Sequence, residues 1–519
     1  MLLDSGRGRV GRHGGILTAH QGLKVDLRSC SRTPLIRQQC CAFLLDGDLS
    51  YSKLMNRRDF IARSALAGVA LATPAAIGDT RVSVSIGPPL FTIASDFPGL
   101  GYEISSVAGL GLLSPANRAY VELVRTLGRE GVVRVGGNTA DYARYAAAAT
   151  PVSSPYGTTV NDHTLKELGG LLEATGWKLI WALNLGNGTE EDAIAEAKAV
   201  VAVAQDRLLA FEIGNEPDLF SHQKHRPPGY GYEQWLADYR RYKTALRTHL
   251  PGVPFAGPDA AGKTEWVSRF AVDEGKDIVL LTHHYYREGQ NPGSTIEKLL
   301  GVDPKLQPQL DQLRAASQRC GVPYRICEVN SFSGGGRPGV SDTMASALWV
   351  LDYMFTLAAN NCGGVNMETG VNQLGFISSY SPIGDDEQGH YSARPEYYGM
   401  LAFSLAGRGE LLQTEVSPTT TEIKAYATRS KDRALTITLI NKGSAGAILH
   451  LDTKTSSEHS SVLRLEGPAV DARTQVTLGG AEITAAGTWK ASKKELLLVS
   501  GGQLSIPLAA NSAAILNFL

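Results

Sequence analysis

The chain has 519 residues, of which 43% are hydrophobic and 19% are charged, and its formal net charge is −1. This length is too great for one small hydrophobic core, so we expect a large domain with a smaller accessory one. The nearly balanced charge gives no general attraction to nucleic acid or to an anionic membrane surface, and neither is predicted as a partner.

Residues 55–79 have the pattern of an export signal. The paired arginines Arg57 and Arg58 precede an apolar run over 61–77 that is rich in small residues and ends near Ala76. A basic start, a short apolar core and a small-residue end indicate export, and the two arginines favour the twin-arginine route. The alternative is a membrane anchor, but the run is short and rich in alanine and glycine, so stable membrane insertion is not expected. We therefore predict an exported protein, periplasmic or secreted, of bacterial type.

Residues 1–54 lie upstream of a plausible start at Met55 and show no periodic pattern, so they are interpreted as a non-native or disordered extension. The mature chain would then keep three cysteines, Cys320, Cys327 and Cys362. Their spacing matches neither a disulfide framework nor a zinc site. No metal and no cofactor is predicted.

Eight short apolar runs alternate with helical patterns over 91–400. They are 97–104, 132–137, 178–185, 208–216, 253–257, 278–285, 324–328 and 364–368. Apolar strands separated by helices indicate a parallel sheet, and eight of them favour a closed (β/α)8 TIM barrel. A helical pattern over 341–360, with Ser341 as its expected N-cap, illustrates the other half of the repeat. An open doubly wound sheet shares this alternation and is the competing interpretation.

The hydrophobic period changes after residue 400. Apolar residues then recur at every second position, as in Leu435, Ile437 and Leu439, with polar turns between such runs. This pattern is typical of antiparallel strands, so residues 401–519 are predicted to form a β-sandwich domain. Residues 80–90 alternate in the same way, and we expect them to supply an N-terminal strand to that domain.

The strongest local motif closes the fourth predicted strand with Gly214-Asn215-Glu216-Pro217. Catalytic groups of barrel enzymes sit at the carboxyl ends of strands, which is where Glu216 falls. Asn215 is placed to bind a sugar 2-hydroxyl, and Pro217 ends the strand. An Asn-Glu-Pro tripeptide by itself usually marks a turn, so the position after an apolar strand is what makes Glu216 a catalytic candidate.

A second carboxylate, Glu328, ends the seventh predicted strand. Side chains at the ends of strands four and seven can approach across the mouth to the roughly 5–5.5 Å that retaining glycoside hydrolysis requires. One carboxylate would attack the sugar while the other handles the proton. The alternative for each glutamate is a buried salt bridge, but two such residues at strand ends favour catalysis.

Other polar residues at strand ends are candidate substrate-binding groups. Tyr285 is placed to hydrogen-bond the nucleophile, and the adjacent His283 and His284 point to opposite faces of a strand, which argues against a shared metal ion. Glu103 and Asn138 follow the first two strands and are expected either to bind sugar hydroxyls or to cap the barrel.

A triple glycine follows the seventh strand in Ser333-Gly334-Gly335-Gly336. Consecutive glycines let a substrate approach the backbone, and their N–H groups suit an anion such as a uronic-acid carboxylate. A flexible turn is the alternative. The loop does not match a nucleotide-binding loop, because it has no lysine at the required place.

Taken together, these motifs resemble glycoside hydrolase family 79, the group of β-glucuronidases and heparanases. The resemblance covers about residues 90–400 and extends toward the end of the chain. It rests on Gly101-Tyr102-Glu103, Arg134-Val135-Gly136-Gly137-Asn138, Gly214-Asn215-Glu216-Pro217-Asp218-Leu219-Phe220, Gly257-Pro258-Asp259, His284-Tyr285-Tyr286, Glu328 with Asn330-Ser331 and the triple glycine, Pro338-Gly339-Val340-Ser341-Asp342, and Arg394-Pro395-Glu396-Tyr397-Tyr398-Gly399.

The resemblance implies that Glu216 is the acid/base and Glu328 the nucleophile of a retaining exo-β-glucuronidase. It also implies sugar contacts from Asn215, Glu103, Asn138 and Tyr285, and a carboxylate site at the Gly334 and Gly335 amides. The chain departs from the family at Ser333, where a tyrosine usually donates its hydroxyl to the uronate. An endo-acting heparanase-like enzyme, a hydrolase for a neutral sugar and a non-catalytic carbohydrate-binding protein are the alternatives.

Overall fold

The computed structural model describes residues 77–370, 378–386 and 388–518, with side chains from Ser83 onward. The extension over 1–54 and nearly all of the export signal over 55–79 lie outside the described residues. Within the described part of the chain, no helix combines the length and apolar character that a bilayer crossing requires.

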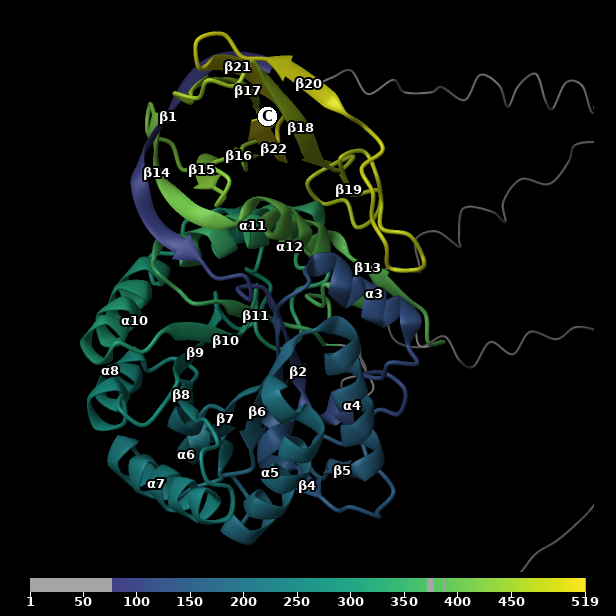
Figure 1. Ribbon diagram of the computed structural model, residues 1–519, viewed down its shortest axis with the longest axis vertical. Coiled ribbons are helices and arrows are strands. Elements are labelled where there is room, and N and C mark those ends of the chain that lie inside the picture. The colour runs from purple at the N-terminus through teal and green to yellow at the C-terminus, as the bar shows by residue number, and fades with distance from the viewer. Residues whose placement is uncertain (1–76, 371–377, 387, 519) are drawn as a thin grey trace, which may run out of the picture. The chain divides into compact units, whose positions relative to one another are not determined.

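The larger part of the described chain is a barrel of eight parallel strands (Figure 1). In spatial order these are β7 (Leu208–Ile213), β6 (Lys178–Leu183), β3 (Val132–Gly136), β2 (Gly99–Glu103), β11 (Val365–Glu368), β10 (Tyr324–Asn330), β9 (Leu280–Tyr286) and β8 (Ala256–Ala260). The two end strands meet where the Phe211 amide donates to the Pro254 carbonyl over 2.9 Å and Phe211 pairs with Phe255. The predicted barrel is confirmed, and the open doubly wound sheet is not formed.

Helices surround the barrel and bury their apolar faces against it. The longer ones are α3 (Arg118–Leu127), α4 (Asp162–Thr175), α5 (Glu190–Ala204), α7 (Tyr232–His249), α8 (Thr264–Asp273), α10 (Leu306–Cys320), α11 (Met344–Ala359) and α12 (Pro395–Ala406). Helix α4 begins after Asn161, whose side chain accepts the Thr164 amide in a capping box. Leucines at positions 165, 168, 171 and 172 then face the core.

Helix α11 starts later than the sequence indicates. Its N-cap is Thr343, so the expectation that Ser341 caps the helix was wrong. The Ser341 hydroxyl instead accepts the Arg337 amide at 2.9 Å and lies 2.8 Å from the Ser331 hydroxyl. Ser341 therefore stabilises the glycine-rich loop rather than the helix.

Ten further strands form one mostly antiparallel sheet, and the other described strands form two short pairs, β4 with β5 and β12 with β13. The main path runs β19 (Thr477–Leu478), β18 (His459–Glu466), β22 (Ser512–Phe518), β16 (Leu435–Asn441), β15 (Ile423–Arg429), β14 (Gly409–Ser417), β1 (Ile77–Ile93), β17 (Gly446–Asp452) and β21 (Gln503–Leu508), with β20 (Glu495–Leu498) on β18. The strand expected over 80–90 lies within β1, which pairs antiparallel with β14 and parallel with β17. Alternate residues of these strands share a core of their own.

The β-sheet region attaches to the barrel through helix α11. Asp352 of that helix accepts from the Tyr426 hydroxyl at 2.6 Å and pairs with Lys442 at 2.6 Å. The ring of Tyr426 also stacks on Phe355, with 4.6 Å between centroids. These contacts hold the β-sheet region against a helix on the outside of the barrel. They do not cover the carboxyl ends of the barrel strands, where a site can form.

Candidate active site

The two predicted catalytic carboxylates meet at the carboxyl ends of the barrel strands. Glu216 follows β7, and Glu328 lies near the end of β10. One carboxylate oxygen of each lies within 4.8 Å of the other. Both side chains line a cavity of about 550 Å³, a size suited to a small ligand. Its lining consists of Glu103, Asn138, Glu216, Leu219, Gln223, Ala261, Tyr286, Glu288, Gly289, Glu328, Ser333, Gly334, Gly335, Glu368 and Tyr380.

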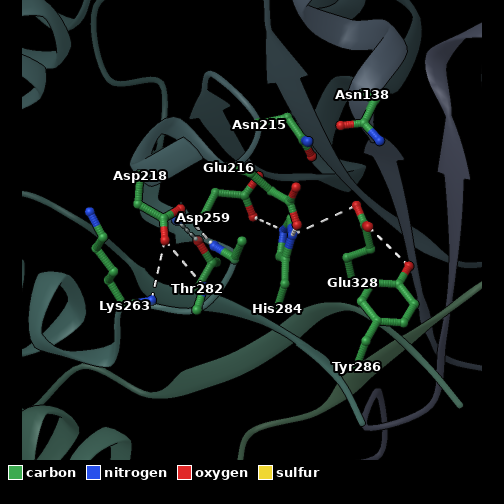
Figure 2. A network of polar contacts seen from close by, with 12 residues as sticks. Asn138, Asn215, Glu216, Asp218, Asp259, Lys263, Thr282, His284, Tyr286 and Glu328 are labelled. Atoms are coloured by element: carbon green, nitrogen blue, oxygen red, sulfur yellow. Dashed lines mark hydrogen bonds and ion pairs between the residues drawn. The ribbon is translucent and has the colours of Figure 1, made fainter. Parts of the chain in front are cut away.

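The backbone of Glu216 adopts a conformation that is uncommon for a non-glycine residue. Its φ is 52° and its ψ is 49°, in the left-handed region. The Glu216 amide donates to the Asp259 carbonyl at 3.0 Å, and its own carbonyl accepts the Leu219 amide at 2.8 Å. Such strain persists only where the surroundings enforce it, and here it turns the Glu216 side chain toward Glu328 (Figure 2).

A neighbouring clamp holds this turn in place. The Asp218 carboxylate accepts the amides of Ala261, Gly262 and Lys263 at 2.8, 3.2 and 3.2 Å (Figure 2). It thereby joins the loop after β7 to the loop after β8, at the point where the barrel closes. The acid/base candidate is thus carried by a loop tied to both of its flanking strands.

Arg134 forms the floor of the site. Its side chain is fully buried, and its guanidinium donates to Glu328 at 2.8 Å, to Asp259 at 2.6 Å, to Glu212 at 3.1 Å and to the Asn215 side-chain oxygen at 2.9 Å. A buried cation with several carboxylate partners is well compensated, so the guanidinium can stay charged in the interior of the barrel.

His284 connects the two sides of the floor. One ring nitrogen lies 3.0 Å from a Glu216 oxygen, and the other lies 2.7 Å from an Asp259 oxygen (Figure 2). Although burial opposes protonation, Asp259 and Glu328 raise the pKa of His284 well above its ordinary value. The imidazolium therefore donates in both directions, and it fixes the orientation of the Glu216 carboxyl.

The surroundings of the Glu216 carboxyl suit a proton donor. Burial raises the pKa of Glu216, the hydrogen bond from His284 opposes this rise, and the nearby charge of Glu328 adds to it. Asp259 behaves in the opposite way, because Arg134 and His284 outweigh its burial and lower its pKa. The site therefore separates a carboxyl that holds its proton more readily from one that is fixed as an anion.

Tyr286 supports Glu328, and the expectation that Tyr285 does so was wrong. The Tyr286 hydroxyl donates to Glu328 at 3.0 Å, whereas the Tyr285 hydroxyl donates to Asp303 at 2.7 Å. The ring of Tyr285 stacks on Tyr353 of α11, outside the barrel. Successive side chains of a strand point to opposite faces of the sheet. The register of β9 therefore decides which of the two neighbouring tyrosines faces Glu328.

Of the other predicted sugar-binding residues, some line the cavity and one is buried beneath it. Glu103 and Asn138 line the cavity, and Glu103 accepts the Asn138 and Thr139 amides at 3.1 and 2.7 Å. Burial and the charge of Glu328 raise the pKa of Glu103 to about 7. Asn215 is 1% exposed, and its amide N–H donates to Asp141 at 3.0 Å, which fixes the residue beside Glu216.

The glycine-rich loop forms one wall of the cavity. Ser333, Gly334 and Gly335 line it, and the two glycines have φ values of 78° and 88°. The Ser333 amide and carbonyl pair with Glu288 and Gln290, so the loop is joined to the segment after β9. Among the described residues, the amides of Gly334 and Gly335 have no acceptor, which leaves these donors for a ligand.

The same side chains have the spacing of a metal site. Glu216, His284 and Glu328 each offer a ligand atom within 4.8 Å of the others. However, both ring nitrogens of His284 are engaged with carboxylates, and Arg134 already compensates Glu328. A divalent cation would have to displace these protons and oppose the arginine, so the donor set fits a proton-transfer site better than a metal centre.

Several residues of the site were not predicted as functional. Arg134, Asp259 and Tyr286 are present in the motifs above without a role of their own, and Glu212, Glu368 and Tyr380 are not named among the candidates. A charged residue inside an apolar strand was the signal available for the first two, because burying a charge in a barrel requires a partner.

No family model matches the chain. Among curated proteins, a β-glucuronidase from Aspergillus niger is 28% identical over 365 residues, covering 63% of this chain and 66% of the relative. A β-glucuronidase from Neurospora crassa is 27% identical with the same coverage, and rat heparanase is 23% identical over 42% of this chain and 40% of its own. The predicted relation to β-glucuronidases and heparanase is confirmed. The match spans slightly less than two thirds of each fungal relative.

Solved structures show the same fold at lower identity. A 4-O-α-L-rhamnosyl-β-D-glucuronidase from Fusarium oxysporum superposes with a TM-score of 0.71 at 19% identity, covering 85% of this chain and 100% of that one. A family 51 α-L-arabinofuranosidase from Bifidobacterium longum gives a TM-score of 0.63 at 14% identity, covering 84% and 99%. Both structures show that the chain shares the fold of these barrel proteins.

Proposed function

We propose that the protein is a retaining glycoside hydrolase, an exo-β-glucuronidase, with Glu216 as acid/base and Glu328 as nucleophile. The observation that supports it most is the approach of the two carboxylates within 4.8 Å. Retaining enzymes hold their carboxyl groups about 5–5.5 Å apart, whereas inverting enzymes leave about 6.5–9.5 Å for a water molecule. The names of the fungal relatives support the glucuronide substrate.

In the first step, an oxygen of Glu328 attacks the anomeric carbon and forms an ester with the sugar. Arg134 and Tyr286 donate hydrogen bonds to that carboxylate at 2.8 and 3.0 Å. These two bonds fix the orientation in which the carboxylate attacks. The bond from the anomeric carbon to the leaving oxygen breaks, and Glu216 donates its proton to that oxygen. The sugar is then bound covalently, and Glu216 is ionised.

In the second step, Glu216 removes a proton from water, and the water oxygen attacks the anomeric carbon. The ester to Glu328 breaks, the β configuration is restored, and Glu216 is protonated again. His284 stays bound to Glu216 and Asp259 through both steps and stabilises the ionised form of the acid/base between them. Two inversions at one carbon give net retention.

Recognition of the sugar is assigned to the cavity wall and floor. The amides of Gly334 and Gly335, with the Ser333 hydroxyl, would receive the uronate carboxylate, while Asn215 would bind the 2-hydroxyl and Glu103 and Asn138 other hydroxyls. Among the described lining residues there is no lysine or arginine. Backbone amides of a glycine-rich loop can bind an anion without such a side chain.

The endo-acting alternative receives less support from the charges around the cavity. Endo action on sulfated chains calls for basic side chains along a cleft. Arg226 donates to the carbonyls of Leu185 and Gly186, and Arg287 donates to those of Gly301 and Val302. Both arginines are therefore used in holding loops. A neutral sugar remains the second candidate, because Ser333 replaces the expected tyrosine.

The test is a panel of aryl β-glycosides, namely the glucuronide, glucoside, xyloside and galactoside, with the configuration of the first product followed by NMR. Preferred hydrolysis of the glucuronide with initial release of the β-anomer is expected. Activity confined to neutral sugars would overturn the glucuronide assignment, and release of the α-anomer would overturn the retaining mechanism.

Export by the twin-arginine route is likewise proposed, on the sequence of residues 55–79 alone. Replacing Arg57 and Arg58 with lysine should keep the protein in the cytoplasm of a bacterial host, whereas the unchanged chain should be recovered outside it. Equal distribution of both proteins would contradict this route.

A further inference from the structure

Two segments that line the cavity beside Glu216 also carry aromatic rings that the reaction above does not use. Asn138 and Gln223 line the cavity next to Glu216, and the Gln223 side-chain amide donates to the Asn138 oxygen at 3.3 Å. Asn138 opens the short helix η1 (Asn138–Tyr142), and Gln223 ends α6 (Phe220–Gln223). Tyr142 ends the same short helix that Asn138 begins, and His225 follows Gln223 by two residues.

The rings pack on one another in a fixed order. The Tyr142 centroid lies 4.7 Å from that of His225 and 5.1 Å from that of Tyr156, which meets it edge to face at 87°. His225 is itself held against Gly186, where an added Cβ would approach its ring nitrogen at 2.7 Å. Tyr156, by contrast, is 77% exposed, so the outermost ring has one face free for a ligand.

The loop that carries Tyr156 is tied to the barrel mouth. It connects β4 (Arg144–Tyr145) with β5 (Thr159–Val160), and Val152 bridges to Thr159. The Ser153 hydroxyl donates to the Ser105 carbonyl at 3.0 Å, directly after β2. A large exposed aromatic side chain on an anchored loop costs less entropy to use in binding than one on a free loop.

We propose that Tyr156, Tyr142 and Gln223 form a subsite for a saccharide leaving group, next to Asn138, which lies at the border between this subsite and the glucuronyl sugar. This inference rests on the proposed function, because a general acid must face the oxygen of the leaving group, and these residues lie on the Glu216 side. The combination of an aromatic face with two side-chain amides suits a pyranose, which offers apolar C–H groups on one face and hydroxyls at its edge. A simple phenol would use the ring and leave the amides without a partner.

The test compares three β-glucuronyl compounds with the wild type, Tyr156→Ala and the ring-retaining control Tyr156→Phe. Cellobiouronic acid has a hexose leaving group, the 4-nitrophenyl glucuronide has an aryl one, and glucuronyl fluoride releases only a fluoride ion, which is too small to use the subsite. For Tyr156→Ala, kcat/KM on the disaccharide should fall about five- to tenfold relative to the fluoride, as expected for one stacking contact. Tyr156→Phe should keep the wild-type ratio.

The outcomes separate the subsite from the reaction. An equal loss on the disaccharide and the fluoride would overturn the subsite and assign Tyr156 a structural role. A loss confined to the aryl glucuronide would overturn the saccharide assignment in favour of an aromatic leaving group. Failure of all three compounds to react with the wild type would overturn the proposed function, and the subsite with it. Gln223→Ala should reproduce the disaccharide loss, because it removes an amide from the same wall.

Discussion

The floor and the glycine-rich wall of the cavity are built in different ways. The floor consists of side chains on barrel strands, and its charges compensate one another through Arg134 and His284. The wall after β10 offers backbone amides and one small hydroxyl, at Gly334, Gly335 and Ser333. In the proposed function, the floor fixes where bonds break, whereas the wall determines which sugar is held there. Changes in the floor should therefore affect turnover of every substrate, and changes in the wall should affect the choice among substrates.

The largest effect is expected for Glu328→Gln. An amide cannot form the sugar ester, so kcat should fall by about 10⁴-fold or more on all glycosides of the panel. The replacement has nearly the same volume and keeps an acceptor for Tyr286, so the fold should be retained. Turnover is measured with the aryl glucuronide, and thermal unfolding serves as the control. Residual activity above about a hundredth of wild type would assign the nucleophile elsewhere.

Glu216→Ala should reduce turnover by about 10²- to 10⁴-fold, and the loss should depend on the leaving group. A good leaving group departs without a proton, so the first step survives for activated substrates while the second step becomes slow. Added azide should restore turnover by attacking the sugar ester in place of water. The product to detect is β-glucuronyl azide. Its absence, or formation of the α-azide, contradicts the assigned role of Glu216.

The neighbouring tyrosines of β9, Tyr285 and Tyr286, allow the same substitution to be compared inside and outside the floor of the site. Tyr286→Phe removes the 3.0 Å hydrogen bond to Glu328, so kcat should fall about tenfold because a bond to a charged group contributes about 1.5–3 kcal/mol. Tyr285→Phe removes the bond to Asp303 outside the barrel and should lower only the free energy of unfolding, by about 1 kcal/mol. Steady-state kinetics and denaturant unfolding of both variants distinguish the two roles. Equal kinetic losses would contradict the register described here.

This pair also shows how far sequence reasoning reached. Strand periodicity located the barrel, and the position of glutamates at strand ends located Glu216 and Glu328. The identity of the inward-facing tyrosine depended on a single-residue register, which the run Thr282–Tyr286 does not fix because all of its residues can be buried. The hydrogen bonds that Arg134 makes to four different strands or loops are long-range, so no local pattern reports them.

His284 should affect the pH dependence of activity through its hydrogen bond to Glu216. The proposed mechanism needs Glu328 ionised and Glu216 protonated, so activity should fall at high pH as Glu216 loses its proton. Because the hydrogen bond from His284 lowers the pKa of Glu216, His284→Asn should raise that pKa and move the alkaline limb of kcat/KM to higher pH. Profiles of wild type and variant on the same aryl glucuronide measure the shift. A limb that moves to lower pH would show that His284 does not act on Glu216 as a cation.

The wall should respond with the smallest changes, and these should differ between substrates. Ser333→Ala removes one hydroxyl beside the Gly334 and Gly335 amides, so kcat/KM should fall about threefold for the glucuronide and remain unchanged for the glucoside. Ser333→Tyr should act in the opposite direction, because a longer side chain brings its hydroxyl closer to a bound carboxylate. The measured quantity is the ratio of kcat/KM for the two substrates. If both substrates change equally in either variant, Ser333 acts on the shape of the loop and the carboxylate is bound by other groups.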